Sequence, residues 1–171
     1  MALSKKKLES NLLKILKQSH NNFLAPAKAW AWAYTDYAKS ATGCLLTGLV
    51  QPQVLVAQKL MTASFVAAFS GSKDPINWCT NTGLAISTFW LAPPLAFIPA
   101  GPNPGVIGPF LPTLFVTALL KVIVKNSVEA AAGVEQKTPK VAKQLASALH
   151  KATKEVPSIY SGVGGCSDSI T

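Results

Sequence analysis

Arginine is absent from this chain of 171 residues, and all 16 of its basic side chains are lysines. The guanidinium group is the planar donor that reads base edges and clamps phosphates, so its absence disfavours specific nucleic-acid recognition. With seven acidic residues the formal net charge is still +9. Lysines can give a diffuse, salt-sensitive attraction to DNA. Non-specific nucleic-acid binding through lysine is therefore one alternative function.

Charged residues of either sign are scarce. They make up 13% of the chain, whereas hydrophobic residues make up 49%, and an average soluble domain carries about 25% charged residues. This number of charged residues is too small to cover the surface of an isolated monomer. We expect that the exterior either contacts a membrane or becomes interior when subunits assemble.

The residue types that bind metals or act as nucleophiles are few and dispersed. Cys44, Cys79 and Cys166 are odd in number and far apart, and His20 and His150 stand in the first and last expected helices. Neither set has the spacing of a zinc site or of a disulfide framework. We expect buried free thiols and no metal or cofactor.

Recognised catalytic motifs are also missing. The acidic residues never form a close pair, and the sequence has no GxSxG and no phosphate-binding GxxxxGK[ST] loop. The glycine-rich SGVGGC near the end opens no helix, so a dinucleotide site is not expected there. The sequence therefore predicts a protein that is not an enzyme.

What the chain does contain is helical periodicity. Apolar spacing, capping residues and prolines in first turns predict a single all-α domain over residues 1–171. The expected helices, five to six in number, cover residues 4–22, 25–41, 52–71, 74–92, 113–134 and 138–156. Residues 1–22 form a basic amphipathic helix that packs on its own core or binds a partner or membrane surface. Residues 158–171 form a small polar tail that is loose or ordered by a partner.

The segment 93–112 holds seven prolines among mostly apolar residues. It cannot be a continuous helix, and flexible linkers are normally polar. Two interpretations stay open. It is an extended strap over a neighbouring hydrophobic surface, or a long connection within the same subunit.

An integral membrane protein is the main alternative. Residues 75–120 carry no formal charge, and a helical hairpin in 75–124 would place Lys73 and Lys121 on one side. Pro93, Pro94 and Pro99 interrupt its first half, however, and lipid cannot satisfy the backbone groups that they free. We therefore favour protein as the partner.

The expected mechanism is burial of aromatic and aliphatic side chains against neighbouring chains. The residues predicted to anchor such an interface are Trp30, Trp32, Trp78, Trp90, Phe97 and Phe110.

A further pattern resembles the small virion structural proteins of large tailed bacteriophages. An AWAWAYTDYAKSA helix precedes TFWLAPPLAFIPAG, then comes the helix VAKQLASALHKATKEV, and YSGVGG follows near the end. The resemblance covers residues 28–165 and carries over no functional residues. It implies a non-enzymatic component of a capsid, neck, tail or baseplate, located in the virion and assembled in the host cytoplasm. Its partners would be other structural subunits, including copies of itself.

Overall fold

The computed structural model describes residues 3–20, 22–43, 46–71, 74–92, 95–99, 105–160 and 166–171. Within these residues the chain forms six helices and five short strands. The helices are α1 (Lys5–Leu16), α2 (Leu24–Ala38), α3 (Gln51–Gly71), α4 (Pro75–Leu91), α5 (Thr113–Ala131) and α6 (Thr138–Lys154). The strands are β1 (Leu46–Leu49), β2 (Ala96–Pro99), β3 (Gly105–Ile107), β4 (Pro157–Tyr160) and β5 (Cys166–Ser169).

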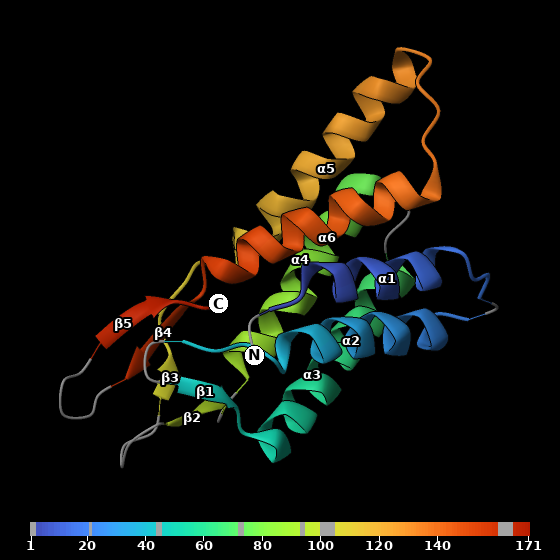
Figure 1. The fold of residues 1–171 in the computed structure, drawn as a ribbon. Helices are drawn as coiled ribbons and strands as arrows, with labels where there is room; N and C mark the ends of the chain where they lie inside the picture. The colour runs from blue at the N-terminus through green and yellow to red at the C-terminus, as the bar shows by residue number, and fades with distance from the viewer. Residues whose placement is uncertain are drawn as a thin grey trace.

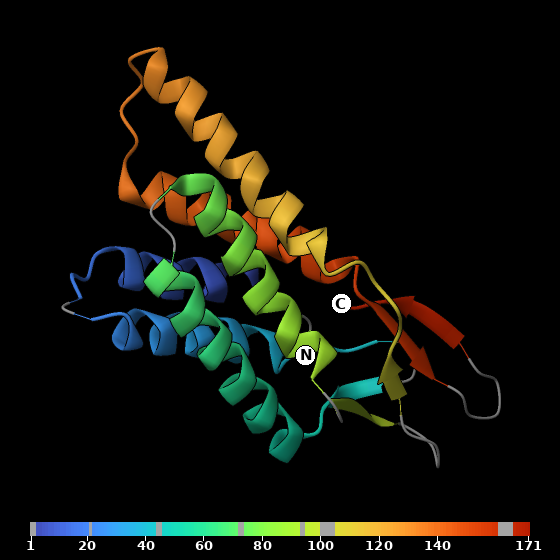
Figure 2. The ribbon, with the colours of Figure 1, turned by 180° about the vertical axis from the view of Figure 1, so that it is seen from behind.

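The helices form a closed ring. Each of them packs against the next in the sequence, and α6 returns to pack against α1. The strands lie together at one end of this bundle, while the second half of α5 projects away from the opposite side (Figure 1, Figure 2). A single core of buried side chains fills the ring.

The helix starts follow from local chemistry. Ser4 caps α1 by accepting a hydrogen bond from the Lys7 amide, and Asp74 caps α4 with Pro75 in the first turn. For α6, the Thr138-Pro139 pair predicts a helix cap at Thr138, and this prediction is wrong. Thr138 is already helical, and Lys137 occupies the cap position without a side-chain hydrogen bond.

The apolar face of α1 packs on the chain's own core. Leu8 and Leu12 are at most 1% exposed, and α1 lies against α2 and α6. Of the two interpretations of the N-terminal helix, the structure supports the intramolecular one.

The all-α expectation is only partly right, because the five strands form one antiparallel sheet in the order β1-β2-β3-β4-β5. Each strand has three or four residues, too few to produce a clear alternation of apolar and polar positions. The described parts of the proline-rich segment 93–112 supply β2 and β3. Phe97 of β2 is fully buried, so β2 packs on the chain's own core, which favours the interpretation of this segment as a connection within the subunit.

The C-terminal tail is anchored rather than loose. β4 and β5 pair over four registered positions, and Ile170 is fully buried. The backbones of Thr171 and Thr42 exchange two hydrogen bonds of 2.9 Å each. Long-range pairing of this kind leaves no local sequence signal, so the small polar residues alone predict a tail that is loose or ordered by a partner.

At the centre of the bundle, Tyr34 connects four helices. The Trp90 indole Nε1 donates to the Tyr34 hydroxyl at 2.8 Å. Because the Thr153 hydroxyl donates to the Leu149 carbonyl at 2.8 Å, Tyr34 must donate to Thr153, 2.7 Å away. The Tyr34 ring also makes edge-on contacts with Phe89 and Phe115. Burial raises the pKa of Tyr34 far above its ordinary value. The phenol therefore keeps the proton that it donates to Thr153.

Tyr34→Phe should lower the free energy of unfolding by about 1–3 kcal/mol, because the buried Trp90 N–H loses its acceptor. Tyr37→Phe is the matched comparison. Its hydroxyl contacts His150, which reaches solvent, and it should cost about 0.5–1 kcal/mol. Urea denaturation measures both, and equal costs would contradict the central role of Tyr34.

The helices α4 and α5 approach each other closely at Gly83. A Cβ atom placed there would lie 2.5 Å from the Val116 backbone nitrogen. Ser87, one turn further along α4, donates to the Pro112 carbonyl at 2.6 Å. The missing side chain thus allows the α4 and α5 backbones to come within contact of one another.

Gly83→Ala should destabilise the protein by about 1–3 kcal/mol, although alanine favours a helix, because the backbone of α5 must move. Gly71→Ala, at the end of α3 where nothing lies within 4 Å of the added atom, should change stability by less than about 0.5 kcal/mol. Thermal unfolding of both variants tests this. A Gly83→Ala protein as stable as the parent would show that the two helices can separate freely.

Candidate interaction surfaces

The structure places the six predicted anchor residues in different environments. Trp30, Trp90 and Phe97 are at most 4% exposed and belong to the chain's own core. Their prediction as interface residues is wrong for this fold, because the ring of helices already buries them.

The other three are more accessible. Trp78 and Phe110 are half-buried at the edge of the core, in ring contact with Trp30 and Phe115 respectively. Trp32 is 52% exposed on α2. Trp32 is therefore the strongest remaining interface candidate of the six.

A larger apolar surface lies along α3 and α4, and the sequence analysis missed it. Val56, Leu60, Ala63 and Ala67 are exposed at successive helical spacings of four, three and four residues. Leu84 of α4 adjoins Ala67 across a shallow hollow and is 40% exposed. We call these five residues the α3–α4 face.

Charge is almost absent from this part of the molecule. Lys59 is the single charged residue of α3, and α4 has none. Because residues 52–71 are apolar on most of the helix circumference, the sequence alone predicts a largely buried helix, and the exposed stripe shows that this prediction is wrong. The exposure of this stripe follows from the packing of α3 mainly against α2 and α4, which tertiary structure alone provides.

Among the described residues, α3 is also the one helix whose length and composition would allow it to cross a membrane. Only 28% of its apolar window is buried within the chain. The predicted hairpin in 75–124 instead supplies α4, β2, β3 and part of α5, and α4 and α5 lie in mutual contact.

Among the described residues, Asp36 is one of two acidic side chains that each contact two lysines, the other being Glu129. The Asp36 carboxylate contacts Lys39 Nζ at 2.6 Å and Lys7 Nζ at 3.0 Å, and Asn11 donates to it at 3.3 Å. Burial opposes ionisation of Asp36, but the hydrogen bonds from Lys39, Lys7 and Asn11 outweigh it and lower the pKa of this carboxyl. The cluster joins α1 to the end of α2, and its role is structural.

The side chains that could carry chemistry stay apart. Of the described residues, no three His, Cys, Asp or Glu side chains lie close enough to hold a metal ion. Cys79 is buried, which raises the pKa of its thiol to about 11 and makes it a poor nucleophile. Cys44 lies outside the described residues, as does the side chain of Cys166.

His150 accepts or donates one hydrogen bond through Nδ1, to the Tyr37 hydroxyl at 2.8 Å. Burial lowers the pKa of His150, and the nearby charges of Lys154 and Lys5 lower it further. These two lysines come from α6 and α1, so the packing of α1 on α6 gathers positive charge around this histidine. His20 is far from it in sequence, and its Nε2 is buried without a hydrogen-bond partner within the described part of the chain.

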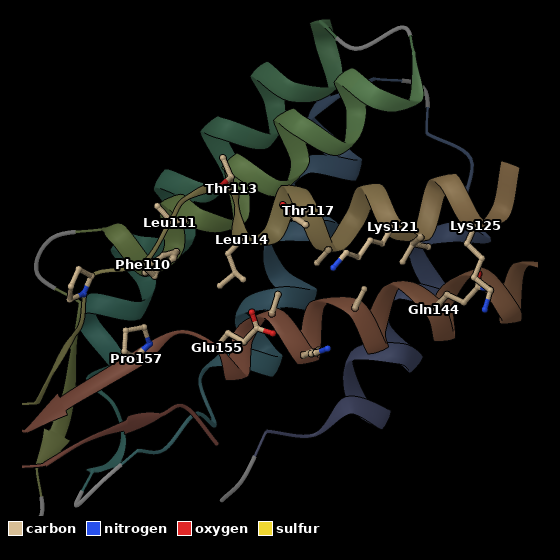
Figure 3. A pocket seen from close by; sticks show the side chains of 16 residues that line it. Phe110, Leu111, Thr113, Leu114, Thr117, Lys121, Lys125, Gln144, Glu155 and Pro157 are labelled. Atoms are coloured by element: carbon tan, nitrogen blue, oxygen red, sulfur yellow. The ribbon is translucent and has the colours of Figure 1, made fainter. Parts of the chain in front are cut away.

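A groove of about 650 Å³ runs between α5 and α6 (Figure 3). At one end, Phe110, Leu114 and Pro157 point into it, and at the other end lie Lys121 and Lys125 (Figure 3). The sequence shows the lysines and the apolar positions of each of these helices. Their combination depends on how α5 and α6 cross.

Comparison of the chain with protein-family models, with curated proteins and with solved structures finds no match.

The low pKa of Asp36 predicts how stability depends on pH. Because the folded pKa lies below the unfolded value, the stabilisation is fully present above about pH 5 and is lost as the pH falls through the folded pKa. Asp36→Asn should remove this acid-dependent part and cost about 1–2 kcal/mol at pH 7.

Glu135→Gln is the matched control, since it removes the same charge from the exposed pair with Lys137 and should change stability by less than about 0.5 kcal/mol. Denaturant titrations from pH 3 to pH 7 distinguish the two variants. Parallel pH profiles for Asp36→Asn and the parent would contradict the assignment.

Proposed function

We propose that this protein is a non-enzymatic structural subunit of a larger protein assembly, in which neighbouring subunits cover the α3–α4 face. The supporting observation is the exposed apolar stripe of α3, from Val56 to Ala67, which is flanked by Leu84 and by a single charge, Lys59. Such a stripe repeats at the spacing that one helix uses to pack against another.

The energetics favour covering this face. Full burial of one Leu or Val side chain contributes about 1.5–3 kcal/mol relative to leaving it in water. Val56 and Leu60 are each 45% exposed, so a partner helix would gain much of that contribution from each. The helix already has its structure in the subunit, so little conformational entropy is lost on docking.

The finer proposal is that the assembly is the virion of a tailed bacteriophage, with copies of this chain among the partners. Its support is the resemblance of the sequence pattern, together with the shortage of surface charge. Mass spectrometry of purified particles from the producing culture tests it. Absence of the chain from the particles would remove the virion assignment and leave the assembly proposal to be judged separately.

Membrane contact through α3 is a second candidate, because this helix has the length and composition of a membrane span and is mostly outside the core. The pairing of α3 with α2 and α4 favours protein, since inserting α3 in a bilayer would detach it from both. Partition into detergent-free vesicles distinguishes the two.

The assembly proposal predicts that the parent protein elutes as an oligomer in detergent-free buffer and that Leu60→Glu dissociates it. A charge in the centre of the face should weaken self-association at least tenfold, because it would be buried without a partner. Val134→Glu is the control. Val134 is as exposed as Leu60, at 46% against 45%, but lies beyond α5. Size-exclusion chromatography with light scattering measures both.

A parent protein that is a monomer at high concentration, binds no vesicles and tolerates Leu60→Glu without change would overturn the proposal. Loss of oligomers in both variants would show that association does not use α3. Binding of the parent to vesicles, abolished by Leu60→Glu, would favour the membrane candidate instead.

A further inference from the structure

The groove between α5 and α6 is apolar at one end and positively charged at the other. The proposed assembly function does not involve this groove. Its middle is lined by small side chains, Ala118 of α5 and Ala148 and Ala152 of α6. Because these residues fill little of the space between the two helices, a channel remains there. Its walls are aliphatic, and water in it would find few hydrogen-bond partners.

One end of the channel is mostly apolar. Phe110, Leu111 and Leu114 come from the segment before α5 and its first turn, and Pro157 closes the same end from β4 (Figure 3). Leu111 is 75% exposed. An apolar end of this kind fits the terminal part of a hydrocarbon chain.

The other end carries positive charge that the protein does not neutralise. Lys121 forms no ion pair within the described residues, and Lys125 reaches Glu129 only at 4.0 Å. The shorter contacts of Glu129 go to other groups, because Lys140 and Gln136 contact its Oε2 at 2.7 and 3.2 Å. Lys121 is thus unpaired within the described residues, and Lys125 has only the long contact with Glu129 Oε1.

A buried amide stands at the same end. The Gln144 side-chain oxygen has no hydrogen-bond partner in the described part of the chain, and Gln144 lies beside Lys125 in Figure 3. Turning the amide by 180° would present its N–H donors to the groove instead. A carboxylate at this end would then accept a hydrogen bond from the turned Gln144 amide.

We propose that this groove binds an anionic single-chain amphiphile of the fatty-acid type. Its carboxylate lies at Lys121, Lys125 and Gln144, and its hydrocarbon chain runs along the alanines toward Phe110.

The direction follows from charge. Three lysines line the groove, Lys121, Lys125 and Lys151, against one acidic residue, Glu155. Glu155 lies toward the apolar end (Figure 3), where it would repel a carboxylate inserted the other way round.

The dimensions favour a small molecule over a partner helix. The volume of about 650 Å³ lies inside the range of small-molecule sites. Leu114 and Lys125 are eleven residues apart on α5, which is about 16 Å along the helix, the length of an extended chain of about ten to twelve carbons. A helix is about 10–12 Å across, too wide for a channel between two helices that are themselves in contact.

Isothermal titration of the full chain with dodecanoate, below its micelle concentration, tests the proposal. We expect saturable one-to-one binding of dodecanoate, at least tenfold weaker binding of hexanoate, and none of dodecyltrimethylammonium, which has the same chain with a positive head. Equal binding of the cationic amphiphile would overturn the charge assignment, and absence of dodecanoate binding would overturn the site.

Three variants locate the ligand, each checked for an unchanged unfolding midpoint. The pair Lys121→Gln and Lys125→Gln should weaken dodecanoate binding at least tenfold, whereas the pair Lys143→Gln and Lys154→Gln, which removes the same charge from α6 outside the groove, should not. Ala148→Phe should abolish binding by filling the channel. If Ala148→Phe unfolds the protein, Ala118→Leu takes its place.

Leu60→Glu separates this site from the α3–α4 face, and it should leave dodecanoate binding intact. Loss of binding in Leu60→Glu, or equal loss in both lysine pairs, would place the ligand elsewhere and overturn the proposal. An acidic amphipathic helical peptide that binds and displaces dodecanoate from the groove would also overturn it, in favour of a protein occupant.

Discussion

The hydrogen-bonded chain from Trp90 through Tyr34 and Thr153 to the Leu149 carbonyl is the interaction on which the rest of the structure depends. Each N–H or O–H donor in it has an acceptor. Polar atoms can lie in an apolar core only when they are hydrogen-bonded in this way. The chain runs across the ring from α4 through α2 to α6, with Phe115 of α5 against the Tyr34 ring. It therefore fixes the relative positions of helices that have no continuous contact of their own.

The arrangement of the helices around Tyr34 also determines which residues lie on the outer surface. Once α2, α4, α5 and α6 surround Tyr34, the helices α1 and α3 complete the circle. α1 is basic and shows its lysines to solvent, whereas α3 is apolar and shows Val56 and Leu60. The molecule thus has a charged side and an uncharged side. This asymmetry suits a subunit that presents one surface to neighbours and keeps the other in water.

The two proposed surfaces depend on different parts of the fold. The α3–α4 face depends on the packing of α3 against α4. Gly83 allows α5 to approach α4 closely on another side. The α5–α6 groove depends instead on alanines where two helices would normally interlock, and on the projection of α5 beyond the bundle (Figure 2). Because the residues of one surface do not line the other, each proposal can stand if the other does not.

The sequence by itself determined the helices. Their apolar spacing, the caps at Ser4 and Asp74, and the prolines that open or end them are interactions between residues a few positions apart, so they are visible in a linear string. Tertiary structure alone decided the sheet, the anchored tail and the two surfaces. The strands pair residues such as Val106 and Ile159, and burial of Trp90 or exposure of Leu60 depends on which helix lies alongside. Such contacts join residues that are distant in the sequence, and local periodicity carries no information about them.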